Sequence, residues 1–264
     1  MFSTLTIAHT IETGTPDLDR LRLAIPGSHL VYTSLESATR LIARDPPQAF
    51  VVRGEVLATR TLTRLAEIKA RYPWLVVLAL VPAEQDLLIG MFELGHAGAD
   101  DFLVAGADSR SPDFRTTLER AGLRATAAAI TDALHPLPAA LAHPNLVHVL
   151  QRIAELKRPH ELAAQLDVRV RNLEKELRQA RLFTPKNLLA RFRITLAAQR
   201  LGVETGSAEQ IALSLEYASG PTLRRACRHL LGVKATEVRE QGGLRFAWRV
   251  LTEAARDHRA KLAG

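Results

Sequence analysis

The sequence has a single cysteine, few aromatic residues (5%) and no long apolar run. One cysteine, Cys227, excludes an internal disulfide and any zinc site built from cysteines. No apolar stretch approaches the roughly 20 residues needed to cross a bilayer, and residues 1–14 lack the basic start, apolar block and cleavage site of a secretory signal. We therefore expect a cytoplasmic globular protein with no membrane partner. Its 264 residues, 47% of them hydrophobic, predict two domains with ordinary cores.

Signatures of enzyme chemistry are also missing. The nine histidines include no His-Glu-x-x-His motif, and His143 and His148 are five residues apart, off one helix face. Asp100 and Asp101 are adjacent, but neighbours in a strand point to opposite faces, so we do not expect them to act together. Cys227 lies in an apolar helical stripe, which predicts a buried, inert thiol instead of a reactive one. We expect no catalytic residue, no metal site and no cofactor.

The positive charge is concentrated in the second half of the chain. Residues 1–135 carry 13 Lys and Arg against 16 Asp and Glu, whereas residues 136–264 carry 22 against 12. A positive field over one domain favours binding to a polyanion, because neutralising phosphates releases condensed counterions. A merely solvated basic surface has the same composition, so the charge indicates nucleic acid only on a suitable scaffold.

The first half alternates short apolar runs with helix-like stretches. Five runs have the length and the branched residues of buried strands, and they cover residues 5–10, 29–34, 48–54, 74–81 and 100–104. Strands that alternate with helices predict right-handed crossovers and a parallel sheet with helices on both faces. The fold class that we expect for residues 1–133 is α/β, with a doubly wound five-stranded parallel sheet.

The second half shows helical periodicity and no strand signal. Three prolines within residues 136–144 predict a linker over residues 134–143. We expect an all-α domain over residues 144–242. A Gly-Gly break then precedes an amphipathic helix over residues 243–264. We expect this helix to pack back on the helical domain with Trp248 buried, the alternative being contact with a partner or with the DNA backbone.

Two segments of the helical domain repeat one plan. Residues 160–182 and residues 208–233 each predict two short amphipathic helices that meet at a tight turn, which is a helix-turn-helix unit. Between the units, Thr184 provides an N-cap and Pro185 a first helical position. One long helix is therefore expected to join the two units.

This series resembles the DNA-binding domain of the AraC/XylS family of transcription regulators over about residues 144–240. The matching positions are Pro185, Leu189, Arg193, Ala197 and Leu201, followed by Ile211-Ala212, Tyr217-Ala218-Ser219, Gly232-Val233 and Arg239. Each motif alone is weak, but three in order at matching spacing are specific. The departures from the family pattern are Glu216 where a Gly is usual, Leu223 and Cys227 where aromatics are usual, and Ala235-Thr236 where a Ser/Thr-Pro pair is common.

The resemblance implies that the second helix of each unit enters the major groove, with its first residues at base edges. In the second unit that helix begins near Gly220, and the candidate DNA contacts are Pro221, Thr222, Arg224, Arg225 and Arg228. We expect Arg224 or Arg225 to read a base, because the planar guanidinium can bond both acceptors of a guanine, and Arg228 to bind phosphate. The expected buried face comprises Leu223, Ala226, Cys227 and Leu230. The alternative is a solvated basic face.

The first unit offers an equivalent polar set, namely Arg169, Arg171, Asn172 and Lys175, with Leu173 and Leu177 facing inward. Asn172 can read an adenine through its amide, or it can serve a local hydrogen bond. Ser219 resembles the family position that caps the reading helix of the second unit, where its hydroxyl can serve free N–H groups. With two reading helices, we expect the domain to dock as a monomer in successive major-groove faces.

Residues 92–104 resemble the segment before the last strand of response-regulator receiver domains, which typically contains Gly-Ala-x-Asp-Tyr-Leu. With the five strand signals, this resemblance covers about residues 1–130. It is of moderate specificity, because doubly wound folds share the same rhythm of strands and helices.

The residues that receiver chemistry needs are absent from the expected positions. A receiver requires acidic side chains after the first strand to hold magnesium, an Asp after the third strand to accept phosphate, and a Lys after the fifth. Here the first strand ends in His9-Thr10, the third has Arg53 at the phosphoacceptor position, and the fifth has Ala105 or Gly106 in the Lys place. We therefore expect a degenerate receiver-like domain that dimerises the chain. The alternative is a ligand site near the carboxyl ends of the strands.

These observations predict a sequence-specific DNA-binding transcription regulator that is not controlled by Asp phosphorylation and is not an enzyme. The expected partners are double-stranded DNA, a second copy of the chain bound through the N-terminal domain, and RNA polymerase. The alternative is a protein-interaction adaptor whose helix-turn-helix fold no longer reads DNA.

Overall fold

The computed structural model describes residues 6–24, 28–53, 59–81, 87–104, 114–203 and 207–263. The chain divides into two compact units, Met1–Ala125 and Thr126–Gly264. The limits of the functional domains that we drew from the sequence stay predictions.

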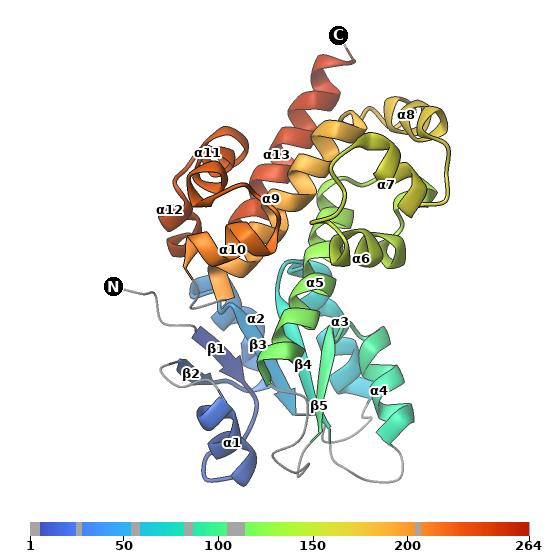
Figure 1. The fold of residues 1–264 in the computed structure, drawn as a ribbon. Coiled ribbons are helices and arrows are strands. Elements are labelled where there is room, and N and C mark those ends of the chain that lie inside the picture. The colour runs from blue at the N-terminus through green and yellow to red at the C-terminus, as the bar shows by residue number, and fades with distance from the viewer. Residues whose placement is uncertain are drawn as a thin grey trace. The chain divides into compact units, whose positions relative to one another are not determined.

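The first unit is built on a five-stranded parallel sheet with the strand order β2-β1-β3-β4-β5 (Figure 1). The strands are β1 (Thr6–His9), β2 (His29–Tyr32), β3 (Ala49–Arg53), β4 (Val76–Val81) and β5 (Asp101–Val104). This order is that of flavodoxin-like doubly wound folds, in which the strand order reverses beside the first strand. The predicted α/β fold class and all five strand positions are confirmed.

Burial along each strand follows its place in the sheet. Every residue of β4 is buried, as are the first four of β3, whereas the edge strand β2 has both of its end residues exposed. A central parallel strand is covered on both faces, which is why β4 consists of the uninterrupted apolar run VVLALV.

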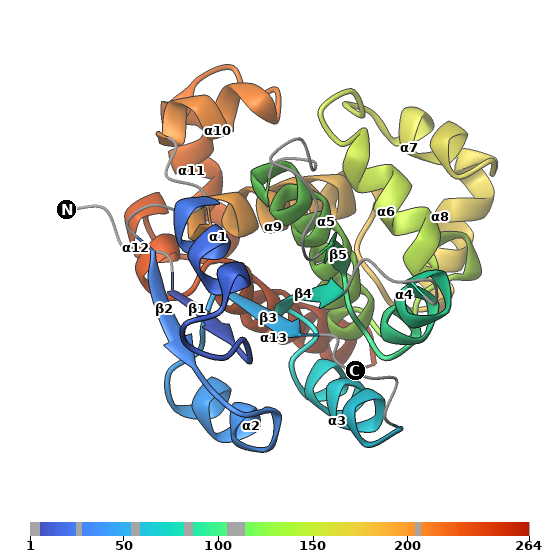
Figure 2. The same cartoon turned by 90° about the horizontal axis from the view of Figure 1, so that it is seen from below.

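Helices cover both faces of the sheet, with α1 and α5 on one face and α2, α3 and α4 on the other (Figure 2). Their bounds are α1 (Pro16–Ala24), α2 (Leu35–Arg44), α3 (Thr59–Arg71), α4 (Leu87–His96) and α5 (Phe114–Ala133). Helix α2 begins after Ser34, whose hydroxyl accepts a hydrogen bond from the backbone N–H of Ser37 at 3.2 Å. Two-sided coverage of this kind is what the alternating pattern of the sequence predicts.

The adjacent aspartates before and at the start of β5 have separate structural partners. Asp100 Oδ2 accepts hydrogen bonds from Lys69 Nζ at 2.7 Å and from the backbone N–H of Val77 at 2.8 Å, which ties α3 to β4 and β5. Asp101 Oδ2 instead accepts from Arg120 Nε of α5 at 2.8 Å. The two adjacent carboxylates thus bind different basic side chains, one on α3 and one on α5.

In the second unit, the described residues 126–203 and 207–263 contain helices and no strand. The elements are η1 (Ala139–Leu141), α6 (His143–Gln151), α7 (Pro159–Gln165), α8 (Val170–Gln179), α9 (Pro185–Val203), α10 (Ala208–Ser214), α11 (Gly220–Leu231), α12 (Ala235–Glu240) and α13 (Leu244–Lys261). The segment predicted as a linker contains the 3-10 helix η1, and both Leu134 and Leu141 are fully buried. The predicted all-helical character of the second half is confirmed.

Helix α9 is the central element of this unit. It packs against α6, α7, α8, α10, α11, α12 and α13. It begins at Pro185 as predicted, and the hydroxyl of Thr184 accepts a hydrogen bond from the backbone N–H of Asn187 at 3.4 Å. Apolar residues such as Leu188, Phe192 and Leu196 are buried around the helix, as expected for one that is enclosed by other helices.

Helix α13 packs along α9, so the C-terminal segment packs on the helical unit. The prediction that Trp248 is buried is wrong, because this side chain is half-buried while Phe246 is buried. The indole Nε1–H of Trp248 donates to Asp132 Oδ2 at 2.8 Å. Tryptophan is often found at the edge of a hydrophobic core, because its ring can be buried there while the indole N–H reaches a hydrogen-bond partner.

Candidate nucleic-acid interface

Two pairs of short helices carry the predicted DNA contacts. The pair α7–α8 lies beside one end of α9, and the pair α10–α11 lies beside the other end (Figures 1 and 2). Within each pair, the two helices contact each other and also α9. The two predicted units therefore correspond to two helix pairs on one common support.

Both pairs turn through an acidic residue in the left-handed conformation. Asp167 and Glu216 have φ angles of 52°. In each turn, the residue that follows donates a backbone hydrogen bond to the preceding helix. Val168 N–H donates to the carbonyl of Ala163 at 3.0 Å, and Tyr217 N–H donates to the carbonyl of Ala212 at 2.9 Å. Glycine suits this conformation because it has no Cβ to clash. The departure from the family pattern at Glu216 thus falls where the backbone favours glycine.

Helix α11 has one buried and one basic face. Leu223 and Cys227 are fully buried, as predicted. The expectation for Ala226 and Leu230 is wrong, because both are half-buried, and Leu231 is the third buried apolar side chain after Leu223 and Cys227. The buried stripe follows a strict i, i+4 spacing, because the surface of α9, α10 and α12 selects which residues it covers.

The basic face of α11 carries the second predicted set of DNA contacts. Arg224, Arg225 and Arg228 are exposed, and none makes a hydrogen bond or ion pair with another residue in the described part of the chain. Pro221 is exposed and Thr222 is half-buried. Three unpaired guanidinium groups within two turns leave a local positive field that is open to a polyanion.

The N-terminus of α11 is capped differently from our expectation. Ser219 occupies the N-cap position, but its hydroxyl makes no capping hydrogen bond and lies 3.2 Å from the hydroxyl of Thr222. The backbone N–H of Gly220 instead donates to Glu209 Oε2 of α10 at 2.8 Å. A carboxylate is an effective substitute, because it satisfies a free N–H and carries the charge that a helix N-terminus favours. The expected capping role of the Ser219 hydroxyl is therefore wrong.

Helix α8 presents the first predicted set. Arg169 is its N-cap residue, and Arg169, Arg171, Asn172 and Lys175 are all exposed, whereas Leu173 and Leu177 are buried as predicted. Asn172 makes no side-chain hydrogen bond with another described residue, so its amide is open. Sequence reasoning missed Arg178, which is also exposed. Its spacing of three from Lys175 and seven from Arg171 places all three on one helix face, and that spacing was the available signal.

Cys227, which departs from the family pattern, and Arg239, which matches it, both make contacts that stabilise the helical unit. Cys227 is fully buried, which confirms the predicted burial, and this burial raises the pKa of its thiol to about 11. Arg239 donates from Nε to the carbonyl of Leu201 at 2.8 Å and so caps the end of α9.

At the described part of the carboxyl edge of the sheet, His9 ends β1 and Arg53 ends β3. His9 at the end of β1 is buried and its Nδ1 donates to the carbonyl of Ile11 at 3.1 Å, while burial lowers the pKa of its imidazole. Arg53 ends β3, and its backbone N–H donates to Thr10 Oγ1 at 2.8 Å. The predicted Lys place at Ala105 or Gly106 lies outside the described residues. Among the residues that are described, no group of three or more His, Cys, Asp or Glu could hold a metal ion.

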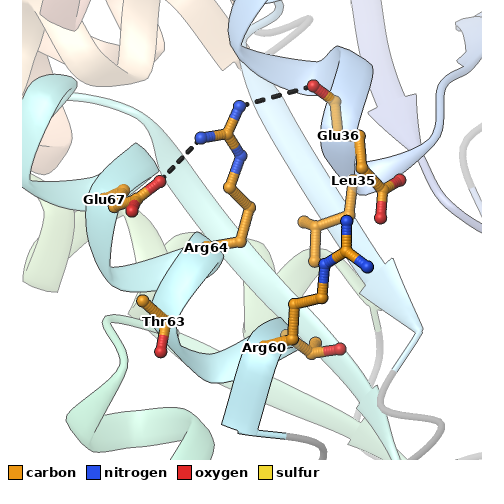
Figure 3. A pocket seen from close by; sticks show the side chains of 7 residues that line it. Leu35, Glu36, Arg60, Thr63, Arg64 and Glu67 are labelled. Atoms are coloured by element: carbon orange, nitrogen blue, oxygen red, sulfur yellow. Dashed lines mark hydrogen bonds and ion pairs between the residues drawn. The ribbon is translucent and has the colours of Figure 1, made fainter.

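A pocket of about 500 Å³ lies between α2 and α3 (Figure 3). Its lining residues are Leu35, Glu36, Arg60, Thr61, Thr63, Arg64 and Glu67. Arg64 Nη1 lies 2.6 Å from Glu67 Oε2, and Arg64 Nη2 donates to the backbone carbonyl of Glu36 at 3.4 Å. With two acidic and two basic side chains, the lining favours neither an anion nor a cation.

Solved structures that resemble parts of the chain include proteins from two organisms. NtrX from Brucella abortus in complex with ADP is 18% identical over 61% of this chain and 39% of that chain, with a TM-score of 0.39. The same protein in complex with ATP is 20% identical over 56% and 34%, with a TM-score of 0.38. Full-length FixJ from B. japonicum is 15% identical over 81% and 98%, with a TM-score of 0.34. The chain thus spans less than two fifths of the length of NtrX.

Sequence comparison finds one family model that matches part of the helical unit. No curated protein sequence matches the chain. In the ranges that the structure describes, no helix is both long and apolar enough to cross a membrane. Residues 162–241, however, match the family model described as a helix-turn-helix domain, and this segment runs from α7 to α12 and contains both helix pairs. Residues 162–241 are therefore similar to helix-turn-helix domains of the AraC type.

Proposed function

We propose that the chain is a sequence-specific transcription regulator that reads DNA with α8 and α11. The observation that carries the proposal is the exposed, unpaired cluster of Arg224, Arg225 and Arg228 on α11. Charged side chains that have no partner among the described residues can bind base edges and phosphates without first breaking an ion pair there.

The support between the helix pairs has a suitable length. Helix α9 contains 19 residues. At about 1.5 Å per residue it spans about 28 Å, which is comparable to the roughly 34 Å between major-groove faces one turn apart. This length supports contact of one domain with two successive groove faces.

The individual roles follow from residue chemistry. We assign a base contact to Arg224 or Arg225, and phosphate contact to Arg228. In the first pair, Asn172 reads a base, while Arg169, Arg171 and Lys175 contact the backbone with Arg178 as an additional cation. Pro221, Thr222 and Ser219 lie at the start of α11, where the backbone approaches the DNA.

We further propose that the receiver-like unit provides dimerisation or signal input without Asp phosphorylation. The support is chemical, because Arg53 stands at the end of β3 and a guanidinium cannot accept a phosphoryl group. Regulators of this kind act on RNA polymerase at promoters, which makes the polymerase the third expected partner.

Selection of randomised duplex DNA by the full chain tests the proposal. A single motif is expected, and Arg224→Ala should relax one position of that motif at a cost of about 1–3 kcal/mol. Arg256→Ala is a matched control, because Arg256 is an exposed arginine of α13 that we assign to no DNA contact. It should leave the motif unchanged.

The competing adaptor hypothesis makes the opposite prediction. If the chain binds DNA in a salt-sensitive way but selects no motif, its basic surface is nonspecific and the helix-turn-helix fold serves protein contacts. A motif that Arg224→Ala and Arg225→Ala both leave intact would instead refute the assignment of bases to α11.

A further inference from the structure

The segment that leads into the first helix pair contacts α7, the central helix α9 and the turn of the second pair. Residues 152–158 connect α6 to α7, and Ile153 and Leu156 within them are buried. Arg152 Nη1 donates to Gln165 Oε1 of α7 at 2.9 Å, so the segment is tied to the first pair.

Arg193 of the central helix holds the same segment. Its Nη2 donates to the carbonyl of Ile153 at 2.9 Å and to the carbonyl of Leu156 at 2.7 Å. These carbonyls follow the end of α6, where backbone acceptors lack helical partners. One guanidinium therefore fixes the entry to α7 against the middle of α9.

The second helix pair reaches this point through its turn. Glu216 Oε2 lies 2.8 Å from Lys157 Nζ, and the side-chain hydrogen bond of Lys157 lowers the pKa of the Glu216 carboxyl. The half-buried ring of Tyr217 has its centroid 5.9 Å from the guanidinium carbon of Arg193, within the range of a cation–π contact. The turn of α10–α11 and the entry to α7–α8 thus meet at one arginine.

We infer that Lys157, Arg193, Glu216 and Tyr217 form a brace that sets the separation and angle of α8 and α11. The inference rests on the proposed function for its consequence in DNA binding, but not for its geometry. Helix α9 connects the two pairs in sequence, and the brace adds a second connection between them. Two helix pairs that are joined both by α9 and by the brace resist rotation relative to each other. Two pairs joined by α9 alone would rotate more freely. Arg193 is therefore a positioning residue for DNA reading that touches no DNA.

The identity of the side chain matters for this role. Arginine presents several donors in a rigid planar fork, whereas lysine is a point charge on a flexible stem. Arg193→Lys keeps the positive charge but replaces the planar guanidinium, which donates to both carbonyls, with a single ammonium group. Arg200→Lys is the matched control, because Arg200 also lies on α9 but donates to Ser214 Oγ of α10 at 2.6 Å, away from residues 152–158.

Distance measurement between spin labels on the full chain tests the brace directly. Labels at Gln179→Cys on α8 and His229→Cys on α11 occupy exposed positions outside the assigned DNA contacts, and the fully buried Cys227 stays unlabelled. The width of the distance distribution is expected to increase about twofold in Arg193→Lys, because no fork holds both carbonyls. Arg200→Lys should leave the width unchanged. Equal widths in wild type and Arg193→Lys, or equal broadening in both variants, would overturn the inference.

Glu216→Gln is the second variant in case Arg193→Lys fails to fold. It keeps the turn and removes the charge that faces Lys157, so we expect a smaller broadening in the same direction. An unchanged distribution in this variant would exclude Lys157 and Glu216 from the brace.

A DNA-binding measurement distinguishes failure of the brace from failure of the proposed function. On a selected site with two half-sites, Arg193→Lys should bind about tenfold more weakly, while its affinity for a single half-site changes less than about twofold, because only joint engagement needs the fixed separation. Equal losses on both DNAs would overturn the positioning role. If wild type selects no site at all, the proposed function fails, and the label distances still decide whether the brace exists.

Discussion

At the scale of single residues, the end of α8 contains a side chain in an unfavourable backbone conformation. Arg181 has a φ of 52°, and the N–H of the following Leu182 donates to the carbonyl of Leu177 at 2.8 Å. This hydrogen bond is that of a Schellman motif, whose left-handed position strongly favours glycine. Arg181→Gly should raise the free energy of unfolding by about 1 kcal/mol, because it removes the left-handed penalty of a side chain.

The matched control is Arg178→Gly, which removes the same charge from inside the same helix. It should lower the free energy of unfolding by about 1 kcal/mol. The free energy of unfolding of both variants can be measured by urea unfolding. The signal is the fluorescence of Trp248 in a Trp74→Phe background. A loss of stability in Arg181→Gly would contradict the strain assigned to this position.

His9 gives the first unit a stability that depends on pH. Burial lowers the pKa of its imidazole below the ordinary value of 6.5, so the folded state resists protonation. The contribution of neutral His9 is complete above about pH 6.5. Stability is lost as the pH falls below this value, by at most about 1.4 kcal/mol per pH unit, until the folded-state pKa is reached.

His9→Gln should reduce this pH dependence, because its amide still donates toward Ile11 but does not titrate. Urea unfolding at pH 7.5 and 5.5, followed through Trp74 in a Trp248→Phe background, compares the two chains. If wild type and His9→Gln lose the same free energy of unfolding between pH 7.5 and pH 5.5, protonation of His9 does not cause the loss.

At the scale of elements, α11 depends on a cap from another helix. Glu209 of α10 accepts the N–H of Gly220, and a Cβ at Gly220 would lie 2.2 Å from Glu209 Oε2. Glu209→Ala should lower the free energy of unfolding by about 1 kcal/mol, because it removes an N-terminal cap and its charge. Glu240→Ala, an exposed change at the end of α12, should have little effect.

A double-mutant cycle sharpens this prediction. Gly220→Ala should destabilise the wild-type chain, because its Cβ displaces the Glu209 carboxylate. The same change should cost less in the Glu209→Ala background, where no carboxylate is displaced. If the two substitutions change the free energy of unfolding additively, the close approach of Gly220 and Glu209 does not contribute to stability.

The elements show what local patterns can and cannot predict. The five strands were predictable because each is a short apolar run, and Thr184-Pro185 marked the start of α9 because caps act on neighbouring residues. The cap of α11 was not predictable, because Glu209 lies 11 positions before Gly220. Likewise Leu231 instead of Leu230 is buried, because the packed neighbours of α11, and not its own periodicity, decide the edge of the stripe.

At the scale of the whole molecule, the partition of charge matches the partition of structure. The excess of basic residues lies in residues 136–264, within the all-helical unit, and the first half carries a slight acidic excess. Composition could predict this division, but it could not predict which cations are unpaired. Arg193 and Arg239 are bound to backbone carbonyls, whereas Arg224 and Arg228 are free of partners among the described residues. Side-chain contacts between distant segments make that distinction.

The position of Arg53 at the end of β3 predicts how the full chain responds to a phosphoryl analogue. Beryllofluoride with Mg²⁺ mimics an acyl phosphate on a receiver only where an Asp can bind it and carboxylates hold the metal. Arg53 ends β3, and the described residues hold no cluster of metal-binding side chains. Addition of the analogue should therefore change the DNA affinity of the full chain less than about twofold, well under the coupling expected of an allosteric effector.

A phosphorylatable receiver protein treated in parallel is the positive control, and its affinity should change. Arg53→Asp is the informative variant, because it restores the acceptor type without the carboxylates that hold the metal. It should remain unresponsive, since beryllofluoride binding needs both parts of the site. A response of the wild-type chain would refute regulation independent of phosphorylation. A response of Arg53→Asp alone would show that the fold still supplies a metal site, and that Arg53 by itself prevents its use.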